Sequence, residues 1–346
     1  MLQFFEVLPV VLGKTRCQES VTYEGNIYCS GFVEVVAWRR LRLNKGIGVM
    51  RIGTLGCLVL WLCAFSNYSF SAEPEVVSLW ANNVPGAAGT EEKDMPRLIL
   101  YPASENPSGT AVVICPGGGY GGLAMGHEGH QVAEWLNKNG ISAFICDYRH
   151  RGKGYGHPYP LMDVQRAIRM VRKNAKEWKI NPEKVGVLGF SAGGHLASSA
   201  STHESIGKLV GDEIDGMPCR PNFSVLCYPV IGFGKPYTHR GSQRNLIGDK
   251  AEKELVQFYS NEEQVDAKTP PAFLWHTTQD KAVPVENSIE YYLACKQHQV
   301  PVSLHVFEQG RHGIGLAVGT KAAFAWPQLC IEWMQELGFA NGKLAK

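Results

Sequence analysis

Residues 184–197 read KVGVLGFSAGGHLA and decide the fold of this chain. Residues 185–188 predict a short apolar strand, residues 189–193 a tight turn, and residues 194–197 the start of a helix. The turn has the pattern G-x-S-x-G, which lifts Ser191 off the end of a sheet on strained backbone. Its neighbours are glycines because side chains there would clash with the turn or cover the hydroxyl. This order of strand, turn and helix indicates a nucleophilic serine.

The composition is that of a globular protein with a sizeable core. Apolar residues make up 45% of the 346 residues and charged residues 19%. The formal net charge is +2, but the basic excess lies in the first 72 residues. After residue 72 the chain holds 27 of its 34 Lys and Arg and 28 of its 32 Asp and Glu, so this part is nearly neutral. We therefore expect neither nucleic acid nor an anionic membrane surface as a partner.

A candidate targeting signal lies near the front of the chain. Met50 and Arg51 begin a short basic segment, residues 53–65 (GTLGCLVLWLCAF) form an apolar run, and the small residues Ser69, Ser71 and Ala72 follow it. This is the three-part plan of a secretory signal, and the run is too short to span a bilayer. We expect a signal peptide at 50–72 and a single secreted or periplasmic catalytic domain at 73–346, with no membrane span. Residues 1–49 are then an over-extended start that is not part of the native protein.

Six of the ten cysteines follow residue 72. Cys115, Cys146 and Cys227 lie in apolar, strand-like runs and are expected to be buried thiols. The others show no C-x-x-C spacing, so we predict no zinc site. Export would permit a disulfide, but the sequence does not pair the cysteines.

From residue 75 onward, strand patterns alternate with helix patterns, which predicts a mainly parallel sheet of about eight strands with helices on both faces. Residues 232–271 form a long insertion that is partly helical at 250–259, and such excursions usually shape a substrate cleft. The predicted strands are 76–80, 97–101, 111–115, 141–146, 185–188, 223–228, 272–276 and 302–307, and the predicted helices are 129–139, 161–178 and 326–337.

A nucleophilic serine needs an oxyanion hole, a base and an orienting acid. Residues 116–120 (PGGGY) directly follow a buried strand, where glycines allow backbone N–H groups to turn toward one point. We predict that the N–H groups of Gly118, Gly119 and Ala192 form the oxyanion hole. Tyr120, beside this loop, is expected either to contact the substrate or to pack in the core.

The acid and the base should follow later strands, the acid first. Asp280 comes just after the strand at 272–276, whereas Asp249 and Asp266 lie in the insertion without a preceding strand. His312 follows the strand at 302–307 in a glycine-flanked loop. Asp280 and His312 are therefore our acid and base.

Other histidines suit other roles. His276 and His305 fall within strands, and His195 lies on the helix after the serine, where it is expected to pack. Residues 127–130 (HEGH) do not have the zinc-protease spacing H-E-x-x-H, so we expect no metal.

Several stretches together resemble the acetylxylan/feruloyl esterase group of α/β-hydrolases, the bifunctional feruloyl and acetyl xylan esterase family. The resemblance covers about residues 75–340. It implies a secreted enzyme that removes acetyl groups, or feruloyl groups, from hemicellulose, and it assigns Ser191, Asp280 and His312 as the triad. The stretches are PGGGYGGLA, EGHQVAEWLNKNGI, DVQRAIRMVRKNAKEW, GVLGFSAGGHLAS, TPPAFLWHTTQDKAVPVENS and RHGIGL.

The expected chemistry is an acyl-enzyme mechanism on an ester of a small molecule, an acetylated oligosaccharide or a polysaccharide, with no cofactor. A prolyl-oligopeptidase-type peptidase usually carries a preceding propeller domain, for which no segment fits here. A xylan glycosidase needs a carboxylate pair that the sequence does not signal. The peptidase and a general short-chain carboxylesterase are our alternatives, and a non-catalytic carbohydrate-binding protein, which predicts a broken triad, comes after them.

Overall fold

The computed structural model describes residues 74–81, 83–204, 206 and 211–342. The predicted over-extended start at 1–49 and signal peptide at 50–72 lie outside the described residues and stay predictions. Among the residues that are described, no helix is long and apolar enough to cross a lipid bilayer.

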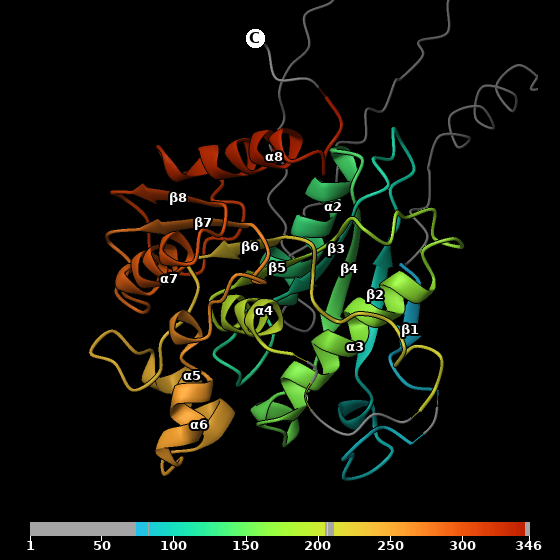
Figure 1. Ribbon diagram of the computed structural model, residues 1–346, viewed down its shortest axis with the longest axis horizontal. Coiled ribbons are helices and arrows are strands. Elements are labelled where there is room, and N and C mark those ends of the chain that lie inside the picture. Colours follow the sequence, from blue (N-terminus) through green and yellow to red (C-terminus); the bar gives the residue numbers. More distant parts are fainter. Residues whose placement is uncertain (1–73, 82, 205, 207–210, 343–346) are drawn as a thin grey trace, which may run out of the picture. The chain divides into compact units, whose positions relative to one another are not determined.

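An eight-stranded sheet forms the centre of the fold, in the order β1-β2-β4-β3-β5-β6-β7-β8 (Figure 1). Strand β2 pairs antiparallel with both β1 and β4, and every pair from β4 to β8 is parallel. The predicted mainly parallel sheet of about eight strands is therefore confirmed. The strands are β1 (Val76–Ser78), β2 (Arg97–Tyr101), β3 (Ala111–Cys115), β4 (Ser142–Asp147), β5 (Val185–Phe190), β6 (Ser224–Cys227), β7 (Ala272–Thr277) and β8 (Val302–Phe307).

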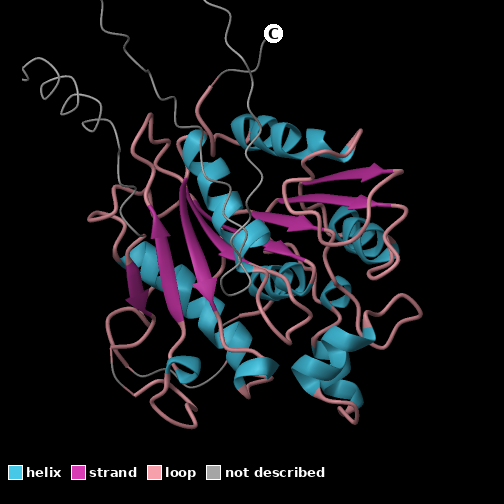
Figure 2. Ribbon diagram, turned by 180° about the vertical axis from the view of Figure 1, so that it is seen from behind, coloured by secondary structure: helices cyan, strands magenta, loops and turns pink. Residues whose placement is uncertain are grey.

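Helices cover both faces of the sheet because successive side chains of a buried strand point to opposite sides. Along β3, Val113 belongs to one buried cluster and Val112 to the other. Helices α3 (Tyr159–Lys173), α4 (Ala192–Thr202) and α7 (Glu286–Gln297) pack on the first face, and α2 (Gln131–Lys138) and α8 (Trp326–Glu336) on the second (Figures 1 and 2).

The insertion at 232–271 carries α5 (Arg240–Ile247) and α6 (Lys253–Phe258), which lie next to each other in Figure 1. The expected helical stretch is thus shorter than 250–259, and α5 was not expected. Short helical turns complete the fold: η1 (Glu92–Asp94), η2 (Gly126–His130), η3 (Arg151–Lys153), η4 (Asn261–Glu263) and η5 (Ala323–Ala325).

Two further helices, α3 and α7, differ from expectation. Helix α3 ends at Lys173 rather than near residue 178, because the chain turns after Asn174 and Trp178 stacks on Phe144 at 4.9 Å. Helix α7 was not predicted, since two of the four residues that it buries, Asn287 and Ser288, are polar.

The cysteines agree with the expectation of buried thiols. Cys115, Cys146 and Cys227 are buried in strands, and all six cysteines of the described part of the chain are free thiols.

Candidate active site

Ser191 lies at the junction of β5 and α4, as the G-x-S-x-G pattern predicts. Its backbone has φ 53° and ψ −119°, a strained conformation for a residue with a side chain. Close packing explains why the flanking residues are glycines. A Cβ at Gly189 would lie 2.0 Å from the carbonyl oxygen of Gly193, and a Cβ at Gly193 would lie 2.0 Å from that of Cys115. Only glycines therefore permit the sharp turn that presents Ser191.

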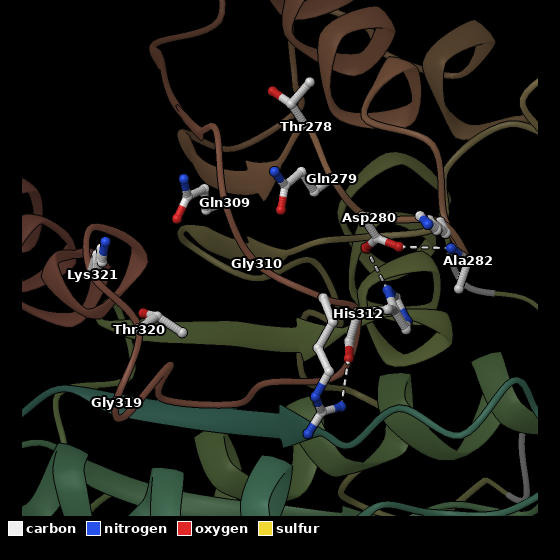
Figure 3. Close-up of a pocket in the computed structure, with 12 residues that line it drawn as sticks. Thr278, Gln279, Asp280, Ala282, Gln309, Gly310, His312, Gly319, Thr320 and Lys321 are labelled. Carbon is white, nitrogen blue, oxygen red and sulfur yellow. Dashed lines mark hydrogen bonds and ion pairs between the residues drawn. The ribbon is translucent and has the colours of Figure 1, made fainter.

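Three predicted residues meet at the carboxyl ends of β5, β7 and β8. Nε2 of His312 lies 2.8 Å from Oγ of Ser191, and Nδ1 of His312 lies 2.5 Å from Oδ2 of Asp280. Figure 3 shows the side chains of Asp280 and His312 pointing toward each other. Since a carboxylate oxygen accepts, Nδ1 carries the proton and donates it to Asp280, which leaves Nε2 as the acceptor for the serine hydroxyl.

Asp280 is held in one orientation by several donors. Oδ1 accepts the backbone N–H groups of Ala282 and Val283, both at 2.9 Å. Nε2 of His276, a fully buried side chain, lies 3.4 Å from Oδ2. Burial tends to raise the pKa of Asp280, but the hydrogen bonds from His276 and His312 outweigh it and lower the pKa well below its usual range. Asp280 is therefore ionised at neutral pH.

The glycine loop at 116–120 lies against the serine turn. A Cβ at Gly117 would lie 3.1 Å from Cβ of Ser191. Gly118 and Gly119 have φ values of 134° and 62°, which favour glycine. The backbone N–H groups of Gly118, Gly119 and Ala192 have no acceptor among the described residues. These three predicted donors are thus free to bind an oxyanion, with Ala192 at the positive end of α4.

The side chain of Tyr120 packs in the core instead of reaching a substrate. It is 1% exposed, and its hydroxyl lies 2.8 Å from Nδ1 of His195. His195 is fully buried, its Nε2 contacts the carbonyl oxygen of Tyr259 at 2.9 Å, and burial lowers its pKa to about 3. The ring of Tyr120 is buried and its hydroxyl is hydrogen-bonded to His195. Of its two expected roles, the structure therefore favours packing in the core over contact with a substrate.

His276, His305 and His130 form hydrogen bonds within the fold. Both ring nitrogens of His276 have partners, since Nδ1 lies 2.8 Å from Oγ of Ser288 and Nε2 lies 2.9 Å from the carbonyl oxygen of Val283. His305 lies in β8, with Nε2 2.9 Å from Oγ of Ser303. In the HEGH stretch, His130 bonds to the hydroxyl of Tyr101 at 2.7 Å. No cluster of His, Cys, Asp or Glu fit to hold a metal occurs in the described ranges.

The sequence reasoning did not single out His239, which the insertion brings to this site. Its Cε1 would lie 3.9 Å from a Cβ built on Gly119. Nδ1 accepts the backbone N–H of Ser242 at 3.3 Å, so Nε2 carries the ring proton. Burial lowers the pKa of His239, and the neighbouring His312 lowers it further, while Asp280 acts in the opposite direction. His239 is thus a neutral N–H donor beside the oxyanion loop, and Nε2 has no acceptor within the described part of the chain.

A pocket of about 1090 Å³ opens beside the His312–Asp280 pair, and residues that follow β7 and β8 line it. Apart from Ala282, Gly310 and Gly319, every lining residue is polar or charged. Ser191 is 6% exposed and is not part of this lining. Gln309, Thr320 and Lys321 line the part away from the Asp280–His312 pair (Figure 3), and Thr278, Gln279, Lys281 and Arg311 complete the wall.

Comparison with known proteins identifies the family. Residues 98–294 match the BD-FAE family over more than half of the chain. The chain belongs to the BD-FAE family. The resemblance seen in the sequence is thereby confirmed, and so is the α/β-hydrolase fold. A structure of an acetyl ester-xyloside bifunctional hydrolase from Caldicellulosiruptor lactoaceticus superposes with a TM-score of 0.73 at 42% identity, covering 78% of this chain and 98% of that one.

Two curated proteins are similar to part of the chain. The acetylxylan esterase of Xylanibacter ruminicola is 40% identical over 68% of this chain and 45% of its own length. Endo-1,4-beta-xylanase B of Butyrivibrio fibrisolvens is 36% identical over 64% of this chain and 35% of its own length. This BD-FAE chain thus spans less than half the length of either relative. The proteins that it resembles include a curated acetylxylan esterase and a solved acetyl ester-xyloside hydrolase.

Proposed function

We propose that this chain is a serine esterase that removes acetyl groups from hemicellulose fragments through Ser191, His312 and Asp280. The observation that carries the proposal is the continuous relay from Asp280 through His312 to Ser191, beside three free backbone donors. This arrangement supplies a nucleophile, a base, an orienting acid and an oxyanion hole, which are the parts that acyl transfer requires.

In the proposed first step, Nε2 of His312 takes the hydroxyl proton of Ser191 while Oγ attacks the ester carbonyl carbon. The carbonyl oxygen becomes an oxyanion that accepts hydrogen bonds from the N–H groups of Gly118, Gly119 and Ala192. Asp280 stabilises the resulting imidazolium of His312. His312 then returns the proton to the leaving sugar oxygen, and the C–O bond of the ester breaks.

In the second step, water replaces the sugar. Nε2 of His312 accepts a proton from the water as its oxygen attacks the acetyl carbon on Ser191. Collapse of the second tetrahedral intermediate breaks the bond to Oγ, and the proton on His312 returns to Oγ. Acetic acid and the free enzyme result.

The lining of the pocket supports a hydroxylated leaving group. Its amide, hydroxyl and cationic side chains suit the hydroxyls of a sugar, and its only apolar side chain is that of Ala282. The relatives named as an acetylxylan esterase and a xylanase point to xylan as the polymer. We therefore favour acetyl over feruloyl esters. His239 fits a substrate contact, because its N–H donor lies beside the oxyanion loop.

Export belongs to the same proposal. A hemicellulose polymer is met outside the cell, and the segment at 50–72 has the plan of a secretory signal. We propose that the enzyme acts in the periplasm or beyond it, after removal of this segment.

The substrate class can be tested by comparing acetate release from acetylated xylo-oligosaccharides with cleavage of 4-nitrophenyl acetate. Ser191-dependent activity on both is the expected result. Activity on the aryl ester alone would keep the mechanism, discard the hemicellulose substrate and favour a general short-chain carboxylesterase.

A further inference from the structure

A buried carboxylate joins two of the active-site loops. Glu128 is 2% exposed and lies in the π-helical turn η2, the HEGH stretch that the proposed chemistry does not use. Its Oε2 accepts the backbone N–H of Gly117 at 2.8 Å. Gly117 directly precedes the proposed oxyanion donors Gly118 and Gly119, so Glu128 fixes the start of the oxyanion loop.

The other oxygen of Glu128 leads to the histidine loop, which we define as residues 310–316. Oε1 lies 2.7 Å from the hydroxyl of Tyr228, and that hydroxyl accepts the backbone N–H of Gly315 at 2.9 Å. Because the backbone N–H can only donate, the hydroxyl proton of Tyr228 is left for Glu128. Burial raises the pKa of Tyr228 well above its usual value, which keeps this proton on the phenol.

Tyr228 also touches the base itself. Its ring meets that of His312 edge to face, with ring centroids 5.0 Å apart and an angle of 66° between the planes. Tyr228 thus supports the histidine loop at two points, at the ring of His312 and at the backbone of Gly315. Both supports depend on a side chain that Glu128 orients.

We infer that Glu128 is a positioning residue that fixes the oxyanion loop and the histidine loop relative to each other, an inference that rests on the proposed function. Two donors converge on it from separate loops, and a carboxylate accepts both at once. A glutamine in its place would offer an acceptor to one donor and an N–H to the other. Glu128 makes no hydrogen bond to Ser191 among the described residues, so its proposed effect is on the positions of the oxyanion donors and of His312 when negative charge develops.

The test compares Glu128→Gln and Tyr228→Phe with the unaltered full chain on 4-nitrophenyl acetate. Active serine is counted by titration with a fluorophosphonate, so that kcat refers to folded enzyme. Misplaced oxyanion donors cost on the order of 10- to 100-fold in kcat, and we expect KM to change by less than about threefold because these donors act in the transition state. The Ki of a phenylboronic acid, which forms a tetrahedral adduct, is expected to rise by the factor by which kcat/KM falls.

Tyr291→Phe is the matched control. Tyr291 is fully buried like Tyr228, but its hydroxyl has no hydrogen-bond partner among the residues that the structure describes. This control is expected to keep the kcat and the boronate Ki of the unaltered enzyme. In the double variant of Glu128 and Tyr228, kcat is expected to fall little further than in the worse single variant, because both changes break one network.

Two results would overturn the inference. The first is that Glu128→Gln and Tyr228→Phe both keep the kcat per titrated serine of the unaltered protein. The second is that kcat and boronate affinity in these two variants fall no more than they do in Tyr291→Phe. A different result separates the proposed function from this inference: if the unaltered chain and Ser191→Ala cleave the ester equally, the serine mechanism is wrong and the positioning role falls with it.

Discussion

Nε2 of His312 lies 2.8 Å from Oγ of Ser191, although 121 residues separate them in the sequence. The parallel sheet explains this approach. Ser191 follows β5 and His312 follows β8, and the carboxyl ends of parallel strands meet at one edge. Asp280 follows β7, which lies between them in the sheet order, and so reaches the far side of the imidazole.

Asp280→Asn is expected to lower kcat by about 10⁴-fold while the protein still folds. The amide would present an N–H to Nδ1 of His312, which disfavours the tautomer that accepts the serine proton. The measurement is kcat on 4-nitrophenyl acetate, with the exposed Asp249→Asn as the control. A larger loss in the Asp249 variant would mean that the acid has been misidentified.

The stability of the enzyme is expected to depend on Asp280 and pH. The folded state lowers the pKa of this carboxyl below the value of about 3.9 that it has in an unfolded chain. The ionised carboxylate therefore stabilises the fold above about pH 4, and this contribution is lost as the pH falls further. The difference in Tm between the unaltered protein and Asp280→Asn should be greatest at neutral pH and shrink toward pH 3. A difference that grows on acidification would contradict the lowered pKa.

His239→Phe is expected to reduce kcat/KM for acetylated xylo-oligosaccharides by about three- to tenfold, which corresponds to one neutral hydrogen bond. Cleavage of 4-nitrophenyl acetate should change less, because its leaving group carries no sugar hydroxyls. His239→Gln, which keeps an N–H donor, should recover part of the loss, and the exposed His298→Asn serves as the control. Equal losses on both substrates would assign His239 to the packing of the insertion instead.

Gly193→Ala is expected to destabilise the protein by about 1–3 kcal/mol or more and to reduce activity. The new Cβ would lie 2.0 Å from the carbonyl oxygen of Cys115 and 2.6 Å from that of Pro116, both backbone atoms next to the oxyanion loop. Gly126→Ala is the matched control, because a Cβ there meets open space. Urea unfolding of both variants checks the expectation. A Gly193 variant as stable and active as the unaltered protein would refute the close packing described at the serine turn.

The sequence was most informative where the role of a residue depends on its neighbours in the chain. Ser191 was predictable because its turn needs glycines on both sides, and Asp280 and His312 were predictable because each follows an apolar strand. Helix α7 was not, since its buried face mixes the polar Asn287 and Ser288 with Tyr291 and Cys295 while Leu293 is 52% exposed, so the sequence shows no clear apolar stripe. These polar residues are buried because they bond to other segments: Oδ1 of Asn287 accepts the backbone N–H of Ile231 at 2.9 Å, and Oγ of Ser288 lies 2.8 Å from Nδ1 of His276.

Other features depend on distant parts of the chain. His239 reaches Gly119 only because the insertion folds back, and no local spacing signals that approach. The packing of Tyr120 depends on His195, and the two are 75 residues apart. For Glu128 the sequence offered only an incomplete metal motif, whereas its actual partners, Gly117 and Tyr228, belong to other elements.

The proposed signal predicts the mature N-terminus. If residues 50–72 are removed on export, the exported protein should begin near Glu73, because the small residues Ser69, Ser71 and Ala72 precede it. N-terminal sequencing of the exported protein checks this. Peptides from residues 1–49 in the native protein would contradict the expected start at Met50.

The central claim is that Ser191 carries the acetyl group during hydrolysis. The most direct measurement is acetate release from acetylated xylo-oligosaccharides by the full chain and by Ser191→Ala, with mass analysis of the Ser191 peptide after rapid acid quenching. We predict that release falls on the order of 10⁴-fold or more in the variant, and that an acetyl group is found on Ser191 in the unaltered enzyme. Comparable acetate release by both proteins, with no acetyl group on that peptide, would contradict the account.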